Sequence, residues 1–471
     1  MKPYLKIINI AVMFALLPGC AALGIDYQRP ESNLPATYAE VGGNQPDNPA
    51  AESKDKWWTL FEDAQLNALI EKAYQNNVDI KLAVARIEEA DAQMREVGAN
   101  LLPSVDLGGE AVRKRVTEAG TATQVSINPS SNYNLALNSS IELDFWGKLR
   151  RAKEAARANY LSTQYAKETV LWSLSSLVAN NYLMIRSLDS QITVNRENQK
   201  ISEESLALTK RRQEGGVASA LDVHQADLVL ADLKSQALEL ERLRAISEHQ
   251  LGVLTGELDL KINQAELLAM PMPPTPPAGL PSSLLEARPD VRQAEQTMVA
   301  ANANIGIAKA ALYPSVSLTG EYGGESLELG DILKSAARIW SFGLTLNLPI
   351  FNAGKLDSRV DQATAKEKQA LASYMNAIQT AFREVNDALV NVRLYKAREA
   401  IALSKQETAQ KMLDVANNRY KAGYSAYIDV LDAQRTHHEA TQNFVQSRQN
   451  TLIATVDLFK ALGGGWQKDM P

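Results

Sequence analysis

Ile428, Asp432 and Arg435 are the residues of this sequence whose types and spacing best suit them to act together. Spacings of four and three residues put an apolar group, a carboxylate and a guanidinium on one face of a helix. The simplest interpretation is a solvated surface ion pair that contributes under about 1 kcal/mol to stability. Whether this face does more depends on the elements that position it.

Catalytic and metal chemistry find no support in the sequence. The only histidines are His224, His249, His437 and His438. The adjacent pair points about 100° apart on a helix, which is a poor geometry for sharing a metal. The sequence contains no phosphate-binding Gly loop, nucleophile elbow or metal-binding His-Glu pair. We therefore predict no enzyme activity, no catalytic residue, no metal and no cofactor.

The first 19 residues predict a secretory signal peptide, because Lys2 and Lys6 precede an apolar stretch at residues 7–17. Leu17-Pro18-Gly19-Cys20 then resembles the bacterial lipobox, in which the cysteine is lipidated and becomes the first mature residue. In that pattern Ala21 favours sorting to the outer membrane. Cys20 is the only cysteine, which excludes disulfides. The alternative is an ordinary signal peptide with an unmodified cysteine.

After Cys20 no run of about twenty apolar residues occurs, which argues against a transmembrane helix. Any part that spans a membrane would therefore have to consist of strands. The net charge of -6, without a basic stripe, argues against a nucleic-acid partner.

Alternation with a period of two predicts such strands in both halves of the chain. In residues 133–145, Leu135, Leu137 and Ile141 lie on one face and polar residues on the other. Residues 340–351 repeat the pattern, starting with Trp340 and Phe342. We predict one hairpin at residues 103–145 and another at 314–351.

Two runs without glycine or proline predict very long helices, at residues 148–214 and 355–422. The second would be about 100 Å long for roughly 68 residues. In it an apolar series recurs at alternating steps of four and three, and alanines form a second stripe a third of a turn away. The series is Leu371, Met375, Ile378, Phe382, Val385, Leu389 and Val392, and the alanines are Ala370, Ala377, Ala381 and Ala388. A helix flanked on two sides suits a ring of helices.

The two halves repeat one another. Leu102-Pro103-Ser104-Val105 and Tyr313-Pro314-Ser315-Val316 are 211 positions apart, and Gly147-Lys148-Leu149 and Gly354-Lys355-Leu356 are 207 apart. This internal tandem repeat predicts two similar structural layers.

We predict the following domain organisation from these patterns. A signal peptide at 1–19 precedes a lipid-anchored N-terminal segment at 20–62, a first structural repeat at 63–254, a Pro-rich linker at 255–281 and a second repeat at 282–471. The first repeat contains the hairpin 103–145, the long helix 148–214 and a helix at 220–254. The second contains the hairpin 314–351, the long helix 355–422 and a helix at 425–462.

Four membrane strands cannot close a barrel, and open strand edges are excluded from lipid. Two copies would give eight strands and a filled interior, whereas three would give twelve strands and an open lumen. We predict a mostly α protein with transmembrane β structure. Its trimer forms a 12-stranded β-barrel, four strands per protomer, continued by a long periplasmic α-helical barrel.

The order and spacing of these motifs resemble the TolC-like outer-membrane factors, in particular the OprM-type lipoproteins of multidrug efflux systems. Besides the lipobox and the duplicated hairpins, the resemblance rests on motifs at residues 419–423, 430–435 and 458–466. It implies a homotrimer that partners with a periplasmic adaptor (membrane fusion) protein. It also implies an inner-membrane, proton-driven pump of the resistance-nodulation-division class.

The resemblance also assigns roles to the turns at the far ends of the long helices. These turns are Gly215, Gly216, Val217, Ala218 and Ser219 in the first half, and Ala422, Gly423, Tyr424 and Ser425 in the second. It implies that they dock on the adaptor, and the alternative is a pair of turns without a partner.

Ile428, Asp432 and Arg435 match the constricting rings of the closed periplasmic entrance in the OprM-type pattern. Three copies of Asp432 near a three-fold axis would repel one another, and Arg435 could offset this repulsion. The first-half equivalents are Leu221, Gln225 and Leu228, which carry no charge.

The expected function is a passive exit duct in the outer membrane of a Gram-negative bacterium, anchored by lipid such as palmitate and extending into the periplasm. Energy and choice of cargo would come from the pump. Two alternatives stay open: an exit duct for type I protein secretion, and a pore-less, lipid-anchored coiled-coil tether.

Overall fold

A computed structural model of the chain describes residues 22–31, 34–35, 37–38, 56–115, 129–275 and 288–464. Cys20 and the predicted signal peptide lie outside these ranges. The chain divides into two compact units, one from Met1–Glu31, Arg86–Gln164 and Gln293–Met375, the other from Ser32–Ala85, Tyr165–Arg292 and Asn376–Pro471. Each unit therefore takes segments from both halves of the sequence.

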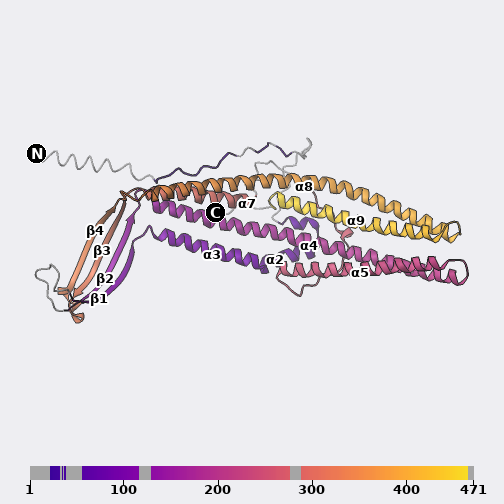
Figure 1. Cartoon of the computed structure of the whole chain (residues 1–471), viewed down its shortest axis with the longest axis horizontal. Coiled ribbons are helices and arrows are strands. Elements are labelled where there is room, and N and C mark those ends of the chain that lie inside the picture. Colours follow the sequence, from indigo (N-terminus) through magenta and orange to yellow (C-terminus); the bar gives the residue numbers. More distant parts are fainter. Residues whose placement is uncertain are drawn as a thin grey trace. The chain divides into compact units, whose positions relative to one another are not determined.

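The first unit contains one antiparallel sheet of four strands, seen side by side in Figure 1. The strands are β1 (Ser104–Lys114), β2 (Ser130–Leu143), β3 (Ser315–Ser326) and β4 (Arg338–Asn347). Their order in the sheet is β1-β2-β3-β4, so β2 and β3 join the hairpins of the two halves. Short 3-10 turns, η5 (Leu329–Asp331) and η6 (Ser335–Ala337), lie between β3 and β4. The predicted strand pairs are confirmed, although β4 ends at Asn347 rather than at residue 351.

The change from strand to helix after β2 is fixed by a glycine and a carboxylate. Gly147 has φ 77°, which favours glycine because a side chain there meets steric strain. Asp144 accepts hydrogen bonds from the backbone N–H groups of Leu149 (3.0 Å) and Arg150 (2.9 Å). These are the unpaired amides of the first turn of α4 (Lys148–Glu214), so Asp144 caps that helix. Gly354, with φ 79°, occupies the equivalent position before α8 (Lys355–Lys421).

Helices make up most of the rest of the described chain. They are α2 (Ala64–Asn76), α3 (Val78–Ala99), α5 (Ala220–Thr255), α7 (Pro289–Ala310) and α9 (Tyr427–Ala461), in addition to α4 and α8, with short 3-10 turns η2 (Trp57–Phe61) and η3 (Leu267–Ala269). The expected helix at 425–462 begins later, at Tyr427, because Ser425 belongs to the preceding turn and Ala426 is the N-cap. Among the described residues, no helix has the length and apolar character needed to cross a membrane.

The second unit has a large apolar core that several of its helices share. Trp57, Trp58 and Phe61 are 2%, 3% and 0% exposed and pack with residues of α2, α4, α5 and α9. The Trp57 ring stacks on Phe459 with ring centroids 5.6 Å apart. These aromatic contacts fix η2 to the end of α9.

Along α8 the buried line differs in detail from the prediction of two separate stripes. In residues 378–392 the buried members alternate between the apolar series and the alanines: Ile378, Ala381, Val385, Ala388 and Val392. Phe382 and Leu389 of the predicted apolar series are only half-buried. Steps of three and four residues drift around a helix, so the line of closest contact runs between the two stripes and draws on both.

Candidate functional site

The turn between α4 and α5 is a glycine-terminated helix end followed by a strongly capped helix start. Gly216 has φ 73°, and the N–H of Val217 donates to the carbonyl of Arg212 at 2.8 Å. Ser219 and Asp222 form a capping box, in which each side chain accepts from the other residue's backbone N–H. The turn is therefore rigid at its α5 side.

The turn between α8 and α9 repeats this geometry 207 positions later. Gly423 has φ 81°, and the N–H of Tyr424 donates to the carbonyl of Arg419 at 2.9 Å. Here the N-cap is Ala426, which has no side-chain cap. Each turn exposes one apolar side chain, Val217 at 71% and Tyr424 at 78%.

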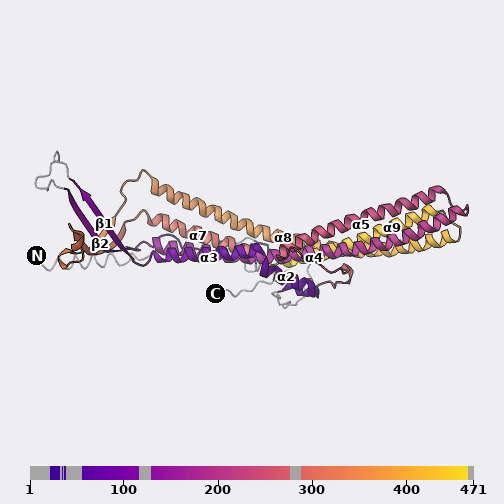
Figure 2. The ribbon, with the colours of Figure 1, turned by 90° about the horizontal axis from the view of Figure 1, so that it is seen from below.

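The two helical hairpins pack against one another near these turns, which lie at the same end of the second unit in Figures 1 and 2. A small core joins α4 and α5 to α9. It consists of Leu206, Ala226, Leu230, Tyr427, Val430 and Leu431. The Tyr427 hydroxyl lies 2.7 Å from the Ser205 hydroxyl, and the Arg212 guanidinium lies 4.4 Å from the centre of the Tyr420 ring. These contacts hold the hairpins together within one chain.

Ile428, Asp432 and Arg435 lie on one face of α9 close to this end, as their spacing predicts. Arg435 Nη2 donates to Asp432 Oδ1 at 3.0 Å, and the two side chains are 70% and 63% exposed. Ile428 is 49% exposed. The ion pair is therefore hydrated in the single chain and adds little to its stability.

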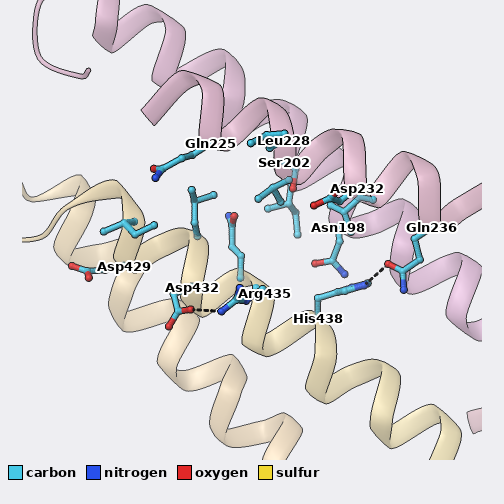
Figure 3. A pocket seen from close by; sticks show the side chains of 16 residues that line it. Asn198, Ser202, Gln225, Leu228, Asp232, Gln236, Asp429, Asp432, Arg435 and His438 are labelled. Atoms are coloured by element: carbon cyan, nitrogen blue, oxygen red, sulfur yellow. Dashed lines mark hydrogen bonds and ion pairs between the residues drawn. The ribbon is translucent and has the colours of Figure 1, made fainter. Parts of the chain in front are cut away.

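A cavity of about 630 Å³ separates this face of α9 from α5 and α4. Figure 3 shows Gln225, Leu228 and Asp232 of α5 on one side and Asp432, Arg435 and His438 of α9 on the other. Gln225 and Leu228 are the sequence equivalents of Asp432 and Arg435, so equivalent positions of the two halves lie on opposite walls. Leu221, the equivalent of Ile428, is not part of this lining.

The side of the cavity away from the turns is closed by a contact between the hairpins. His438 Nε2 lies 3.0 Å from Gln236 Oε1. Burial lowers the pKa of His438, and the neighbouring His437 lowers it further. The ring is therefore neutral at pH 7 and donates from Nε2 to the amide oxygen.

The described residues contain no group of three or more potential metal ligands from His, Cys, Asp and Glu. His437 and His438 make their polar contacts with Thr441 and Gln236.

The sheet of the first unit has one apolar and one polar face. Leu107, Leu137, Tyr322 and Trp340 are cross-strand neighbours in one row and are 68%, 48%, 55% and 76% exposed. The adjacent row, on the opposite face, is Asp106, Asn138, Glu321 and Ser341. A large exposed apolar surface made of strands is typical of contact with lipid or another chain.

Sequence reasoning found the turns and the charged face of α9 but missed the rest of the cavity lining. Asp232, Gln434 and His438 line it, and none of them follows a recognisable motif. Only the alignment of the two halves could have indicated which residues of α5 line the cavity, because it pairs Gln225 with Asp432 and Leu228 with Arg435.

A family model, curated relatives and a solved structure each match most or nearly all of the chain. The model of the family described as "Outer membrane efflux protein" matches residues 69–257 and 280–464. The antibiotic efflux pump outer membrane protein ArpC and the toluene efflux pump outer membrane protein TtgC, both of Pseudomonas putida, are each 35% identical to this chain over 98% of it and 96% of their own length. The open state of the MtrE outer membrane channel of Neisseria gonorrhoeae has a TM-score of 0.85 and 27% identity, covering 95% of this chain and 99% of that one.

Proposed function

Because the chain belongs to the outer membrane efflux protein family, we propose that three copies of it form the exit duct of a tripartite efflux system. The chain is an outer-membrane efflux component of a Gram-negative bacterium, similar to channels rather than to enzymes. A periplasmic adaptor and a proton-driven inner-membrane pump of the resistance-nodulation-division class complete the proposed system. The duct itself is passive.

The observation that carries this proposal is the four-stranded sheet with an apolar face and, among the described strands, two free edges. Each strand must pair along its backbone to be stable in lipid, and a sheet ordered β1-β2-β3-β4 leaves one edge of β1 and one of β4 for other chains. Three such sheets joined edge to edge would supply twelve strands, enough to surround an open lumen. The polar row with Asp106 and Glu321 would then face that lumen, and the row with Leu107 and Trp340 would face lipid.

We further propose that Asp432 and Arg435, with Ile428, form a closed periplasmic entrance. Half-exposed charges on a single chain become crowded when three copies meet at an axis, and Asp432 carboxylates would repel one another there. The ion pair to Arg435 offsets this repulsion in the closed state. Since Gln225 and Leu228 are uncharged, only α9 would contribute charge to the ring.

The turns at Gly215–Ser219 and Ala422–Ser425 are proposed as the adaptor-docking surface. Both contain a positive-φ glycine and expose one larger side chain, Val217 or Tyr424. Two similar tips per chain would give six similar sites per trimer. A docked adaptor would contact the hairpins close to the proposed entrance, which makes adaptor-driven opening physically reasonable.

The lipid anchor is proposed at Cys20, two residues before the described chain. The contacts of the residues that follow Cys20 support an anchor close to the end of the sheet. Leu23 N–H donates to the carbonyl of Trp146 at 2.9 Å, and Arg151 binds Asp26 at 2.6 Å. Ala22 packs so closely on Gly147 that a Cβ added there would lie 2.5 Å from its side chain. Acyl chains on Cys20 would therefore start near the end of β2.

The proposed cargo is small organic molecules. ArpC is named for antibiotic efflux and TtgC for toluene efflux, and both are relatives over nearly their full length. Nothing in a passive duct selects between such molecules, so selection falls to the pump.

The proposal is tested with purified full-length protein in planar lipid bilayers and in a strain that lacks its own outer-membrane efflux components. We expect discrete ion-conducting steps and, with the cognate adaptor and pump, restored resistance to antibiotics or solvents. A tether would give no conductance. A duct for type I secretion would conduct but would restore export of a protein instead of small molecules.

A further inference from the structure

We propose that the cavity between α5 and α9 binds a protonated organic amine that carries an apolar group. The site lies within the second unit of one chain. It shares Ile428, Asp432 and Arg435 with the entrance proposed above, but its binding test needs neither the trimer nor the entrance assignment.

The size and walls of the cavity suit a small organic molecule. Its volume of about 630 Å³ falls within the range of roughly 300–1,000 Å³ typical of ligand pockets. Aliphatic side chains line it from three helices: Ile201 of α4, Leu228, Val229 and Leu233 of α5, and Ile428 and Leu431 of α9. The apolar part of a ligand would be shielded from water between these side chains.

The charges of the lining favour a cation. Asp232, Asp429 and Asp432 contribute carboxylates, whereas Arg435 is the cationic residue of the lining. Arg435 is already paired with Asp432. Within the described chain Asp232 and Asp429 form no ion pair, which leaves an excess of two negative charges. A bound cation would therefore gain Coulomb energy that an anion would lose.

Two buried acceptors point to a ligand with several N–H donors. Gln434 is 9% exposed, and its Oε1 has no hydrogen-bond partner among the described residues. His438 Nδ1 also lacks a partner there. Because the neutral His438 ring donates from Nε2 to Gln236, its Nδ1 carries a free lone pair. Buried acceptors without donors cost free energy, and an ammonium group with up to three N–H bonds can satisfy them.

These features argue against the other ligand classes. An anion would meet the unpaired carboxylates of Asp232 and Asp429. A bound metal ion needs three or more ligands in close range, and no such cluster exists among the residues that the structure describes. A neutral apolar molecule would fill the walls but leave Gln434 Oε1 and His438 Nδ1 without donors.

The experiment uses three indole compounds that differ mainly in charge: tryptamine (cationic), tryptophol (neutral) and indole-3-acetate (anionic). Each is titrated at pH 7 into the purified full-length protein in a non-ionic detergent by isothermal titration calorimetry. Heats measured with detergent alone are subtracted. We expect one tryptamine site per chain, with affinity at least fivefold higher than that for tryptophol, and no saturable binding of indole-3-acetate.

Two variants test the site itself. Asp232→Asn removes an exposed carboxylate on α5 and should weaken tryptamine binding roughly fivefold to tenfold, because a charge-assisted contact is lost. Gln434→Leu keeps the size of the side chain and should also weaken binding. Asp227→Asn removes an exposed carboxylate of the same helix outside the cavity and should change the affinity less than twofold.

Equal affinities for tryptamine and tryptophol would overturn the inference. So would an unchanged tryptamine affinity in Asp232→Asn, or an equal loss in Asp227→Asn, which would indicate attraction to the general surface charge. Because the measurement needs only binding, these outcomes do not depend on conductance or resistance.

Discussion

Asp432 and Arg435 lie three residues apart on α9, joined by an ion pair of 3.0 Å in which both side chains stay more than half exposed. Exposed pairs of this kind contribute under about 1 kcal/mol. We therefore predict that Asp432→Ala with Arg435→Ala changes the thermal unfolding midpoint by only about 1 °C. If the pair closes the entrance, single-channel conductance in a planar bilayer should rise several-fold.

The matched control for this variant is Arg383→Ala with Asp387→Ala. This pair on α8 is 2.8 Å long and similarly exposed, at 64% and 57%. It should have the same small effect on unfolding and none on conductance. A parental conductance in the Asp432 and Arg435 variant, or an equal rise in the control, would remove the entrance assignment.

Gly423 combines a positive φ of 81° with open space around the position of a Cβ. A bulky Gly423→Trp substitution is expected to strain the turn by about 1 kcal/mol and to project a ring from the tip. We predict loss of drug resistance in a complementation assay while the trimer persists on native gels. Gly423→Asn, which tolerates the left-handed conformation, should retain most resistance. Full resistance in Gly423→Trp would count against adaptor docking at this turn.

Phe342 and Ser341 are adjacent on β4 and lie on opposite faces of the sheet. Lysine on the lipid-facing side of a membrane strand costs about 2–4 kcal/mol near the bilayer centre, whereas lysine on the polar side is tolerated. Phe342→Lys should therefore strongly reduce the folded trimer in outer-membrane fractions, and Ser341→Lys should not. Equal amounts of the two variants would show that the face with Phe342 does not contact lipid.

His438 should make the protein less stable in mild acid. Burial keeps its pKa below the usual value, so the unfolded chain takes up a proton near pH 6.5 while the folded chain resists it. Stability is thus complete above about pH 6.5 and falls as the pH drops towards the lower folded pKa. His438→Gln removes this titration and should lose less of its thermal midpoint between pH 7.5 and 5.5.

The control for that experiment is His249→Gln, which removes an exposed imidazole from α5. It should keep the parental pH dependence. An identical pH dependence in His438→Gln and the parent would show that protonation of His438 does not limit stability in this range.

Local patterns sufficed to predict the elements of this fold. Glycine and proline mark where α4 and α8 begin and end, and alternation in β2 and β4 identifies the two faces of the sheet before any pairing is known. The mostly helical fold with a small antiparallel sheet is confirmed. The division of the sequence into two structural repeats stays a prediction. The family model matches each half once, whereas each compact unit contains segments of both halves.

The cavity could not be predicted in this way. Gln236 and His438 are 202 positions apart, and their contact depends on how two helical hairpins pack. Helical periodicity gives the face on which a residue lies but not the partner that this face meets. The buried residues of α8 could not be predicted for the same reason. Ala381 and Val385 are buried on one contact surface, although the sequence placed them on two separate stripes.

The order β1-β2-β3-β4 also has a consequence for how such a molecule can be made. Within the described chain, the outer edges of β1 and β4 find no strand to pair with, so the hydrogen bonds that complete the sheet must come from elsewhere. In the proposed trimer the sheet would gain its full stability only when chains encounter one another, and its apparent unfolding free energy would depend on protomer concentration. Refolding yield should accordingly rise steeply with the number of chains per vesicle, and diluting newly inserted chains in excess lipid should trap them before completion.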